Sequence, residues 1–336
     1  MIVLYLKILP LRRMFPALLM TAAVMMCALG LILTMKAHSA NAQDNEGGAA
    51  SDVSLEMDTG SSKSEESTAE PSEDNAEGSA ASQTPKPVRL CVIMYHGLVK
   101  DSAKQNRYMI DPHFFEDDLR YLTENGYTAI SAKELVGHFI SGMPLPDKPV
   151  MLTFDDGYYN NYLYAFPLLK KYGCKAVLSP IGKACENAEN EERQNEFYSQ
   201  CTISQLREMY ESGLVEIAYH TYDLHSLESG VQGVQKRPDE SDDAYKNRLA
   251  QDIRCFRESM QSADGGELYC FTYPFGAKSR LTGDIVRSEG FLCALDCEEK
   301  VNILGSAEDL YSIHRFLRDG KTSSDEFFRN ISLSGA

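Results

Sequence analysis

Two short runs of side chains in this sequence could hold and use a metal ion. Residues 153–157 read Thr-Phe-Asp-Asp-Gly and place the adjacent carboxylates of Asp155 and Asp156 at the end of an apolar run. Residues 220–225 place two imidazoles, His220 and His225, five positions apart. One carboxylate and two imidazoles form a three-ligand site for a zinc-like ion with a position left for water, and the second carboxylate can act as base on that water. The two runs predict a metal-dependent hydrolase.

The elements that must position these groups alternate along the chain. Strand-like apolar runs are expected at 88–95, 150–154, 175–181, 215–219, 268–272 and 291–295. Helix-like segments between them predict a mostly parallel sheet with helices outside, which is the α/β class. The number of units suits a closed or nearly closed β/α barrel of about seven units. Reactive groups of such barrels gather at the carboxyl ends of strands, where His96, Asp155, Asp156 and His220 are expected.

Local signals fix several helix starts. Asp111 followed by Pro112 predicts a helix start, and Ser131 with Glu134 predicts a capping box. Thr202 with Gln205 predicts a second capping box. Further helices are expected over 160–172, 242–260 and 279–288, whereas 186–196 and 228–243 are interpreted as surface inserts, with a role as substrate-facing loops left open.

The charge of the chain is unevenly spread. The chain of 336 residues has a net charge of −16, and residues 43–87 carry eleven acidic side chains against two lysines. This stretch has few large apolar residues and is predicted to be a disordered linker that its own charge extends. The basic residues of the rest of the chain form no stripe, so nucleic acid is not expected as a partner.

The N-terminus has the pattern of a targeting segment. Lys7, Arg12 and Arg13 precede an apolar run over 15–35, and Ala40-Asn41-Ala42 has the form of a signal-peptidase site. The run is also long enough to span a bilayer. Residues 1–42 are therefore either a cleaved signal peptide or a membrane anchor, and both alternatives place residues 88–336 outside the membrane.

Nine cysteines are present, one of them within the targeting segment. Cys91, Cys270 and Cys293 lie in apolar runs and are interpreted as core residues. Cys185 and Cys201 flank a polar insert and are the best candidates for a disulfide, which an exported domain permits. No Cys-x-x-Cys pair exists, so a thiolate zinc site is not indicated.

Residues 89–328 resemble the polysaccharide deacetylase family, the NodB-homology carbohydrate esterases. The Thr-Phe-Asp-Asp-Gly run matches the first motif of that family. The resemblance implies a distorted β/α barrel that removes N- or O-acetyl groups with one divalent metal ion, expected to be zinc, with cobalt or another divalent ion as the alternative. It also implies that Asp155 is the general base and that Asp156, His220 and His225 bind the metal.

The histidine motifs depart from the common pattern. The i, i+5 spacing of the ligand histidines resembles that of secreted poly-β-1,6-N-acetylglucosamine deacetylases, as does the run Met94-Tyr95-His96-Gly97. That resemblance implies that His96 is the general acid. Ser312-Ile313-His314 is the only match to the last family motif, so His314 is the alternative acid, although neighbouring Arg315 and Arg318 indicate a polar surface strand.

The third motif is represented by Tyr273-Pro274-Phe275-Gly276. The resemblance implies that the backbone N–H of Phe275 binds the oxyanion and that Tyr273, Pro274 and Gly276 contact substrate. Thr272 stands where the family has an arginine that orients the base.

The roles of four further residues stay open in the sequence. The polysaccharide deacetylase family has a motif that combines Asp and Trp. This chain has no Trp, so Asp296 is a candidate for what remains of that motif. Asp223 either orients a ligand histidine or caps the loop. Tyr158 and Tyr159 either stack on sugar or, as the interpretation favoured here, pack at a helix start.

The function expected is removal of N-acetyl groups from an N-acetylglucosamine-containing polysaccharide outside the cell, either an exopolysaccharide or peptidoglycan. An O-acetyl esterase acting on an acetylated, xylan-like glycan is an alternative. A catalytically impaired glycan-binding module is another, favoured by the missing arginine and tryptophan. The intact set of Asp155, Asp156, His220 and His225 argues against a pure binding module.

Overall fold

The computed structural model describes residues 87–228 and 230–331. The predicted targeting segment, residues 1–42, lies outside the described residues, as does the predicted linker apart from residue 87. Within the described ranges, no helix is both long enough and apolar enough to cross a membrane.

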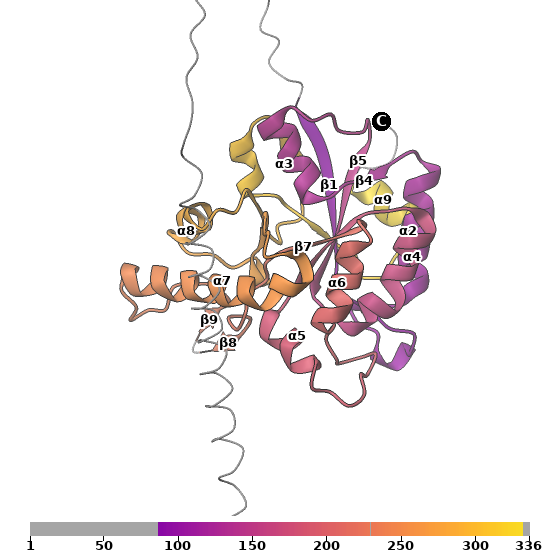
Figure 1. The fold of residues 1–336 in the computed structure, drawn as a ribbon. Coiled ribbons are helices and arrows are strands. Elements are labelled where there is room, and N and C mark those ends of the chain that lie inside the picture. Colours follow the sequence, from indigo (N-terminus) through magenta and orange to yellow (C-terminus); the bar gives the residue numbers. More distant parts are fainter. Residues whose placement is uncertain (1–86, 229, 332–336) are drawn as a thin grey trace, which may run out of the picture. The chain divides into compact units, whose positions relative to one another are not determined.

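The central sheet is mostly parallel (Figure 1). Four neighbouring strands pair in parallel, in the order β1 (Val88–Tyr95), β5 (Pro149–Asp156), β6 (Ala176–Pro180) and β7 (Val215–Ile217). On the other side of β1, antiparallel β12 (Asn302–Leu304) pairs with its beginning and parallel β13 (Phe316–Leu317) with its end. The short β4 (Thr128–Ala129) pairs with the beginning of β5.

Two more parallel strands complete a circuit. β10 (Cys270–Thr272) pairs with β11 (Cys293–Leu295), and single bridges join Tyr219 to Phe271 and Leu295 to Ile313. The pairings therefore lead from β1 through β5, β6, β7, β10 and β11 to the segment that ends in β13, and back to β1. The α/β class is confirmed, and the circuit has the connectivity of an irregular barrel held at two places by single bridges.

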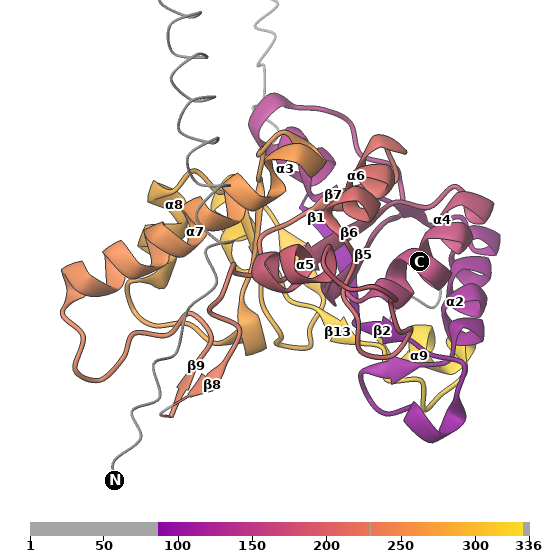
Figure 2. The same ribbon diagram turned by 60° about the horizontal axis from the view of Figure 1, so that its bottom comes forward.

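Helices flank these strands in both views (Figures 1 and 2). One side carries α2 (Pro112–Glu124), α4 (Phe166–Tyr172) and α9 (Ser324–Asn330), and the opposite side carries α7 (Asp242–Asp264) and α8 (Thr282–Ser288). The remaining helices are α3 (Ala132–Ser141), α5 (Gly182–Ala188) and α6 (Ile203–Glu211). Asp111 caps α2, and both predicted capping boxes, at the starts of α3 and α6, are confirmed. Two-stranded ribbons join β2 (Gly97–Leu98) to β3 (Met109–Ile110) and β8 (Leu227–Glu228) to β9 (Val231–Gln232).

Alternation along the strands separates two buried faces. On β5, Leu152 and Phe154 belong to the larger apolar cluster, which includes side chains of α2, whereas Met151 belongs to a smaller cluster with residues of α3. Because successive strand residues point to opposite faces, Thr153 and Asp155 share the face of Met151. This inner face of the circuit is where polar side chains appear near the strand ends.

Several boundaries differ from expectation for identifiable reasons. The helix expected over 160–172 begins as a π turn (Asn161–Ala165), because Pro167 has no N–H for the regular helical ladder. The insert expected at 186–196 begins within α5, whose Cys185 and Ala188 are buried one turn apart. Helix α7 continues to Asp264 and ends at Gly265, which has a φ of 77°.

All eight cysteines in the described residues are free thiols. The disulfide considered for Cys185 and Cys201 is therefore not formed, and both side chains are buried. The core interpretation of Cys91, Cys270 and Cys293 is confirmed, since all three are buried. The polar insert between Cys185 and Cys201 suggested exposed, crosslinked flanks, whereas both flanks pack into the apolar core.

Candidate metal centre and catalytic pocket

Three predicted ligands meet at the strand ends. The ligand atoms of Asp156, His220 and His225 all lie within 4.8 Å of one another. Asp156 Oδ1 is 3.6 Å from His220 Nε2 and 3.4 Å from His225 Nε2, and this buried oxygen has no hydrogen-bond partner. A buried acceptor that faces two imidazole nitrogens fits a divalent ion of the zinc type.

The hydrogen bonding of His220 selects its tautomer. His220 Nδ1 lies 3.0 Å from the carbonyl oxygen of Thr272, so Nδ1–H donates there, and Nε2 is the nitrogen that faces Asp156 and is available to a metal ion in the neutral ring. Burial lowers the pKa of His220, but the neighbouring Asp156 and Asp155 carboxylates outweigh it and the pKa is raised. For His225, burial and then the His220 charge lower the pKa. Thr272, which stands where the family motif has an arginine, contributes its backbone carbonyl to the site through the bond from His220.

Backbone strain is concentrated in the predicted motifs. Among the described residues other than glycine, Asp156, Thr221 and Phe275 have positive φ, at 70°, 76° and 59°. Such conformations are costly for these residues and persist where the surroundings hold them, which is common at functional sites. At the end of β5, Asp156 and Gly157 (φ 76°) turn the chain away directly after the two carboxylates.

Asp155 is held by a buried arginine. Arg315 Nη1 donates to Asp155 Oδ1 at 2.7 Å, and Nη2 donates to Oδ2 at 2.9 Å. Burial raises the pKa of Asp155, but the Arg315 guanidinium more than offsets this and holds the pKa well below its usual range. Arg315 in turn donates through Nε to the carbonyl of Asp296 at 2.8 Å and through Nη1 to Thr153 Oγ1 at 3.2 Å. Asp155 is therefore ionised and fixed in orientation.

The expectation of a polar surface strand at Arg315 and Arg318 is wrong. The side chain of Arg315 is 0% exposed, and Arg318 is buried against Asp118. Sequence reasoning missed Arg315 because two arginines beside a histidine resemble an exposed edge. The apolar residues at alternate positions, Ile313 and Leu317, are the signal that this segment enters the core.

His96 lies in the same pocket as the two carboxylates. Its Nδ1 is buried without a hydrogen-bond partner, and its ring packs against Tyr108 with centroids 4.8 Å apart. Burial lowers the pKa of His96, while Asp155 and Asp156 act in the opposite direction without reversing the shift. The free imidazole is therefore neutral near neutral pH, and it needs a proton before it can act as an acid.

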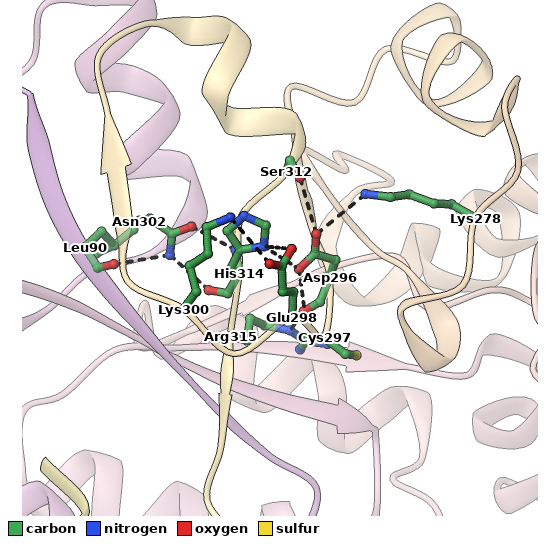
Figure 3. Close-up of polar contacts among 10 residues, drawn as sticks. All are labelled: Leu90, Lys278, Asp296, Cys297, Glu298, Lys300, Asn302, Ser312, His314 and Arg315. Carbon is green, nitrogen blue, oxygen red and sulfur yellow. Dashed lines mark hydrogen bonds and ion pairs between the residues drawn. The ribbon is translucent and has the colours of Figure 1, made fainter. Parts of the chain in front are cut away.

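His314 takes part in a different network, shown in Figure 3. Its Nδ1 lies 3.0 Å from Asp296 Oδ1 and 3.5 Å from Glu298 Oε2, and His314 is not among the residues that line the pocket. These three residues form a second cluster of potential ligands. However, the Lys278 ammonium lies 3.6 Å from Asp296 Oδ2, and its positive charge disfavours the binding of a metal cation there. His314 is adjacent to Arg315 and, by strand alternation, faces the other way.

The third motif is split between the pocket and the core beneath it. Phe275, in the 3₁₀ turn η4 (Pro274–Gly276), lines the pocket, and its ring packs 4.5 Å from that of His225. Tyr273 and Pro274 are buried and, like Gly276, are absent from the pocket lining. Gly276 has a φ of 66°, and a Cβ atom there would lie 3.0 Å from the Cys297 side chain, so the position favours glycine.

The pocket has a volume of about 510 Å³ and brings together His96, Asp155, Asp156, His220, His225 and Phe275. It also contains residues that the sequence did not single out for the site: Met94, Arg107, Tyr108, Leu227, Cys297, Glu299 and Leu317. Arg107 and Tyr108 come from an irregular segment with no periodic pattern, so no sequence signal was available for them.

Two residues left open by the sequence are placed by the structure. Tyr158 lines the pocket, where burial and the Asp156 carboxylate raise its pKa, so it does not serve helix packing alone. Asp223 pairs with Lys183 on the exposed side and bonds neither ligand histidine.

Comparisons with known proteins identify relatives of this chain. Residues 142–294 match the family model described as polysaccharide deacetylase. The Bacillus subtilis protein YxkH, provisionally assigned as a polysaccharide deacetylase, is 31% identical over 237 residues, covering 70% of this chain and 74% of YxkH. The poly-β-1,6-N-acetyl-D-glucosamine N-deacetylase of Escherichia coli K12 is 26% identical over 259 residues, which is 71% of this chain but 38% of that protein.

Two solved structures share the fold. A de-N-acetylase from Aggregatibacter actinomycetemcomitans is 29% identical, with a TM-score of 0.62 over 72% of this chain and 100% of that one. IcaB from Ammonifex degensii is also 29% identical, with a TM-score of 0.59 over 74% of this chain and 97% of its own.

Proposed function

Because this chain belongs to the polysaccharide deacetylase family, whose members are hydrolases, we propose that it is a metal-dependent enzyme that removes N-acetyl groups from an N-acetylglucosamine-containing polysaccharide outside the cell. The observation that carries the proposal is the position of an ionised, arginine-bound Asp155 beside the three-ligand cluster of Asp156, His220 and His225 in one pocket. A binding module has no need of a base beside a metal site.

In this proposal each residue has a distinct task. Asp156, His220 and His225 would hold a divalent ion, which would supply Lewis acidity for the activation of water and of the acetyl carbonyl. Asp155 accepts the proton of that water, and Arg315 keeps the carboxylate ionised and oriented for the transfer. The Phe275 N–H is the proposed donor to the developing oxyanion.

His96 is the proposed acid for the leaving amine. An amine leaves poorly unless it is protonated, so the step needs a donor on the leaving-group side. Burial favours neutral His96 in the free protein, whereas the Asp155 and Asp156 carboxylates favour its protonated form. His96 is therefore expected to gain its proton in the substrate complex and to donate it to the leaving nitrogen.

The mouth of the pocket supports a sugar substrate. Tyr108, Phe275 and Leu227 line it with side chains that are 44%, 41% and 65% exposed. Exposed aromatic faces at a pocket present apolar area that the C–H faces of sugar rings can cover. Among the glycans considered, a poly-β-1,6-N-acetylglucosamine exopolysaccharide is favoured, because that is the substrate named for the Escherichia coli relative.

The proposed site of action is the extracellular side. Lys7, Arg12 and Arg13 before the apolar run, and Ala40 and Ala42 after it, support export with either release or membrane anchoring. The acidic stretch that follows is proposed as a spacer between membrane and enzyme.

Acetate release tests the proposal. The full-length protein is stripped with chelator, reloaded with zinc or cobalt, and offered a β-1,6-linked N-acetylglucosamine oligomer, peptidoglycan fragments and an acetylated xylan in parallel. Metal-dependent release from the first, absent in Asp155→Asn, is expected. Release from peptidoglycan or xylan alone would change the substrate assigned, and no release from any of them with metal bound would favour a glycan-binding module.

A further inference from the structure

A buried carboxylate outside the pocket contacts the segment that carries one of the proposed metal ligands. Asp252 extends from α7 and accepts hydrogen bonds from the Tyr219 hydroxyl at 2.6 Å, the Tyr222 N–H at 2.7 Å and the Asp223 N–H at 2.9 Å. His220 lies between these donors in the sequence. A buried carboxylate is costly unless donors satisfy it, and these three donors do so.

The segment bound by Asp252 is a strained turn. Thr221 has a φ of 76°, a left-handed conformation that threonine rarely adopts. The carbonyls of Thr221 and Tyr222 accept hydrogen bonds from the Gly182 and Lys183 N–H groups of α5, both at 3.0 Å. Helices α5 and α7 are neighbours in both views (Figures 1 and 2). The turn is thus held by amides of α5 on its carbonyl side and by Asp252 on its amide side.

This turn lies between the two ligand histidines in the sequence. His220 precedes Thr221 and His225 follows the turn, yet both Nε2 atoms come within 3.6 Å of Asp156 Oδ1. Strained backbone persists only when its surroundings specify it. Without the Asp252 acceptor, two backbone N–H groups would lose their partner and the turn would be free to relax.

We propose that Asp252 is a positioning residue for the metal centre, which fixes the turn between His220 and His225 and so sets the affinity of the site for a divalent cation. The inference rests on the proposed metal-dependent function. It assigns Asp252 no contact with substrate or metal, and it explains how an i, i+5 pair of histidines can share one ion.

A second buried aspartate provides a matched control. Asp118 extends from α2 and accepts a hydrogen bond from the Tyr95 hydroxyl at 2.9 Å, at the end of β1, and from Arg318 Nε at 2.8 Å. Both aspartates anchor a helix to a tyrosine near a strand end. Asp118 differs because its bonds reach no backbone near a proposed metal ligand.

The test compares Asp252→Asn and Asp118→Asn in the full-length protein. Zinc affinity is measured by competition with a chromophoric chelator, and the melting temperature is measured without metal. We expect Asp252→Asn to weaken zinc binding by about 10- to 100-fold, as is typical for residues that orient ligands. Asp118→Asn is expected to lower the melting temperature without changing zinc affinity.

The outcomes separate this inference from the proposed function. Unchanged zinc affinity in Asp252→Asn, or an equal loss in Asp118→Asn, would overturn the positioning role while the wild type still binds zinc. A wild-type protein that binds no zinc would overturn the metal-dependent function itself. If Asp252→Asn does not fold, Tyr219→Phe removes one donor and keeps the carboxylate. It should weaken zinc binding relative to Tyr95→Phe, and equal affinities in that pair would also overturn the inference.

Discussion

Arg315 and Asp155 form a buried, two-pronged ion pair across 160 positions of sequence, with donor–acceptor distances of 2.7 and 2.9 Å. The pair joins the segment ending in β13 to the end of β5. Arg315 thus lies beside Asp155, although the third sequence motif has Thr272 in the place of an arginine. The residue at position 272 alone therefore does not favour an inactive binding module.

Replacing Arg315 should alter the acidic limb of the pH–rate profile. The guanidinium lowers the pKa of Asp155, so Arg315→Gln raises that pKa and the base becomes protonated, and inactive, at a higher pH than in the wild type. We expect kcat to fall by about 100-fold through loss of orientation as well. Leaving Asp155 buried and unpaired should also cost about 3–5 kcal/mol of stability.

The matched control for this prediction is Arg315→Lys, which keeps a positive charge but loses the two-pronged geometry. Its acidic limb should stay closer to that of the wild type while kcat still falls. An Arg315→Gln enzyme with the wild-type pH profile would show that Arg315 does not tune the base.

Zinc should stabilise the protein by binding to Asp156, His220 and His225, and not to the second cluster of Asp296, Glu298 and His314. Zinc at 100 times its dissociation constant is expected to add about 2.7 kcal/mol to the free energy of unfolding. His225→Ala should lose most of this gain, because it removes one of three ligands. His314→Ala should keep it, since His314 belongs to the network with Asp296 and Lys278. Thermal unfolding with and without zinc checks this, and the opposite pattern would move the metal to the second cluster.

The acid role of His96 predicts a dependence on the leaving group. His96→Ala should lower kcat on an N-acetyl substrate by about 10²- to 10⁴-fold. An activated aryl acetate, whose leaving group needs no proton, should be affected much less. Acetate release from both substrates is compared for His96→Ala and His314→Ala. If His314→Ala showed the selective loss on the amide, the assignment of the acid would be reversed.

Glu216 should make stability depend on pH. Burial raises the pKa of this β7 carboxyl to about 7 in the folded protein, while its Oε2 accepts the Lys133 N–H at the start of α3. Because the folded-state pKa lies above the unfolded value, the contribution of Glu216 is full below pH 4.5 and is lost as the pH rises through about 7. The loss is at most about 3 kcal/mol.

Urea unfolding at pH 5 and pH 8 measures this effect. Glu216→Gln should lose less stability between the two pH values than the wild type does. Glu211→Gln, at an exposed position on α6, serves as the control and should follow the wild type. Equal losses in Glu216→Gln and the wild type would show that Glu216 does not titrate in this range.

The sequence by itself determined much of the local structure and the main chemistry. Asp111 and the two capping boxes predicted helix starts, because capping depends on residues within one turn. The apolar runs identified most of the strands. The Asp155-Asp156 pair and the two histidines also identified the candidate site, because metal ligands are few in kind and lie at strand ends in this class of fold.

Only the tertiary structure decided which buried polar groups meet. Period-two alternation places His314 and Arg315 on opposite faces of their segment, but it does not say which face is the interior when both faces are buried. Closure of the strand circuit decides this, and it turns Arg315 toward Asp155 and His314 toward Asp296. In the same way, nothing local relates Asp252 to the turn at Thr221, because the packing of α7 against α5 and against the segment that follows β7 brings them together. Such pairings depend on contacts between distant segments, and local sequence patterns carry no information about them.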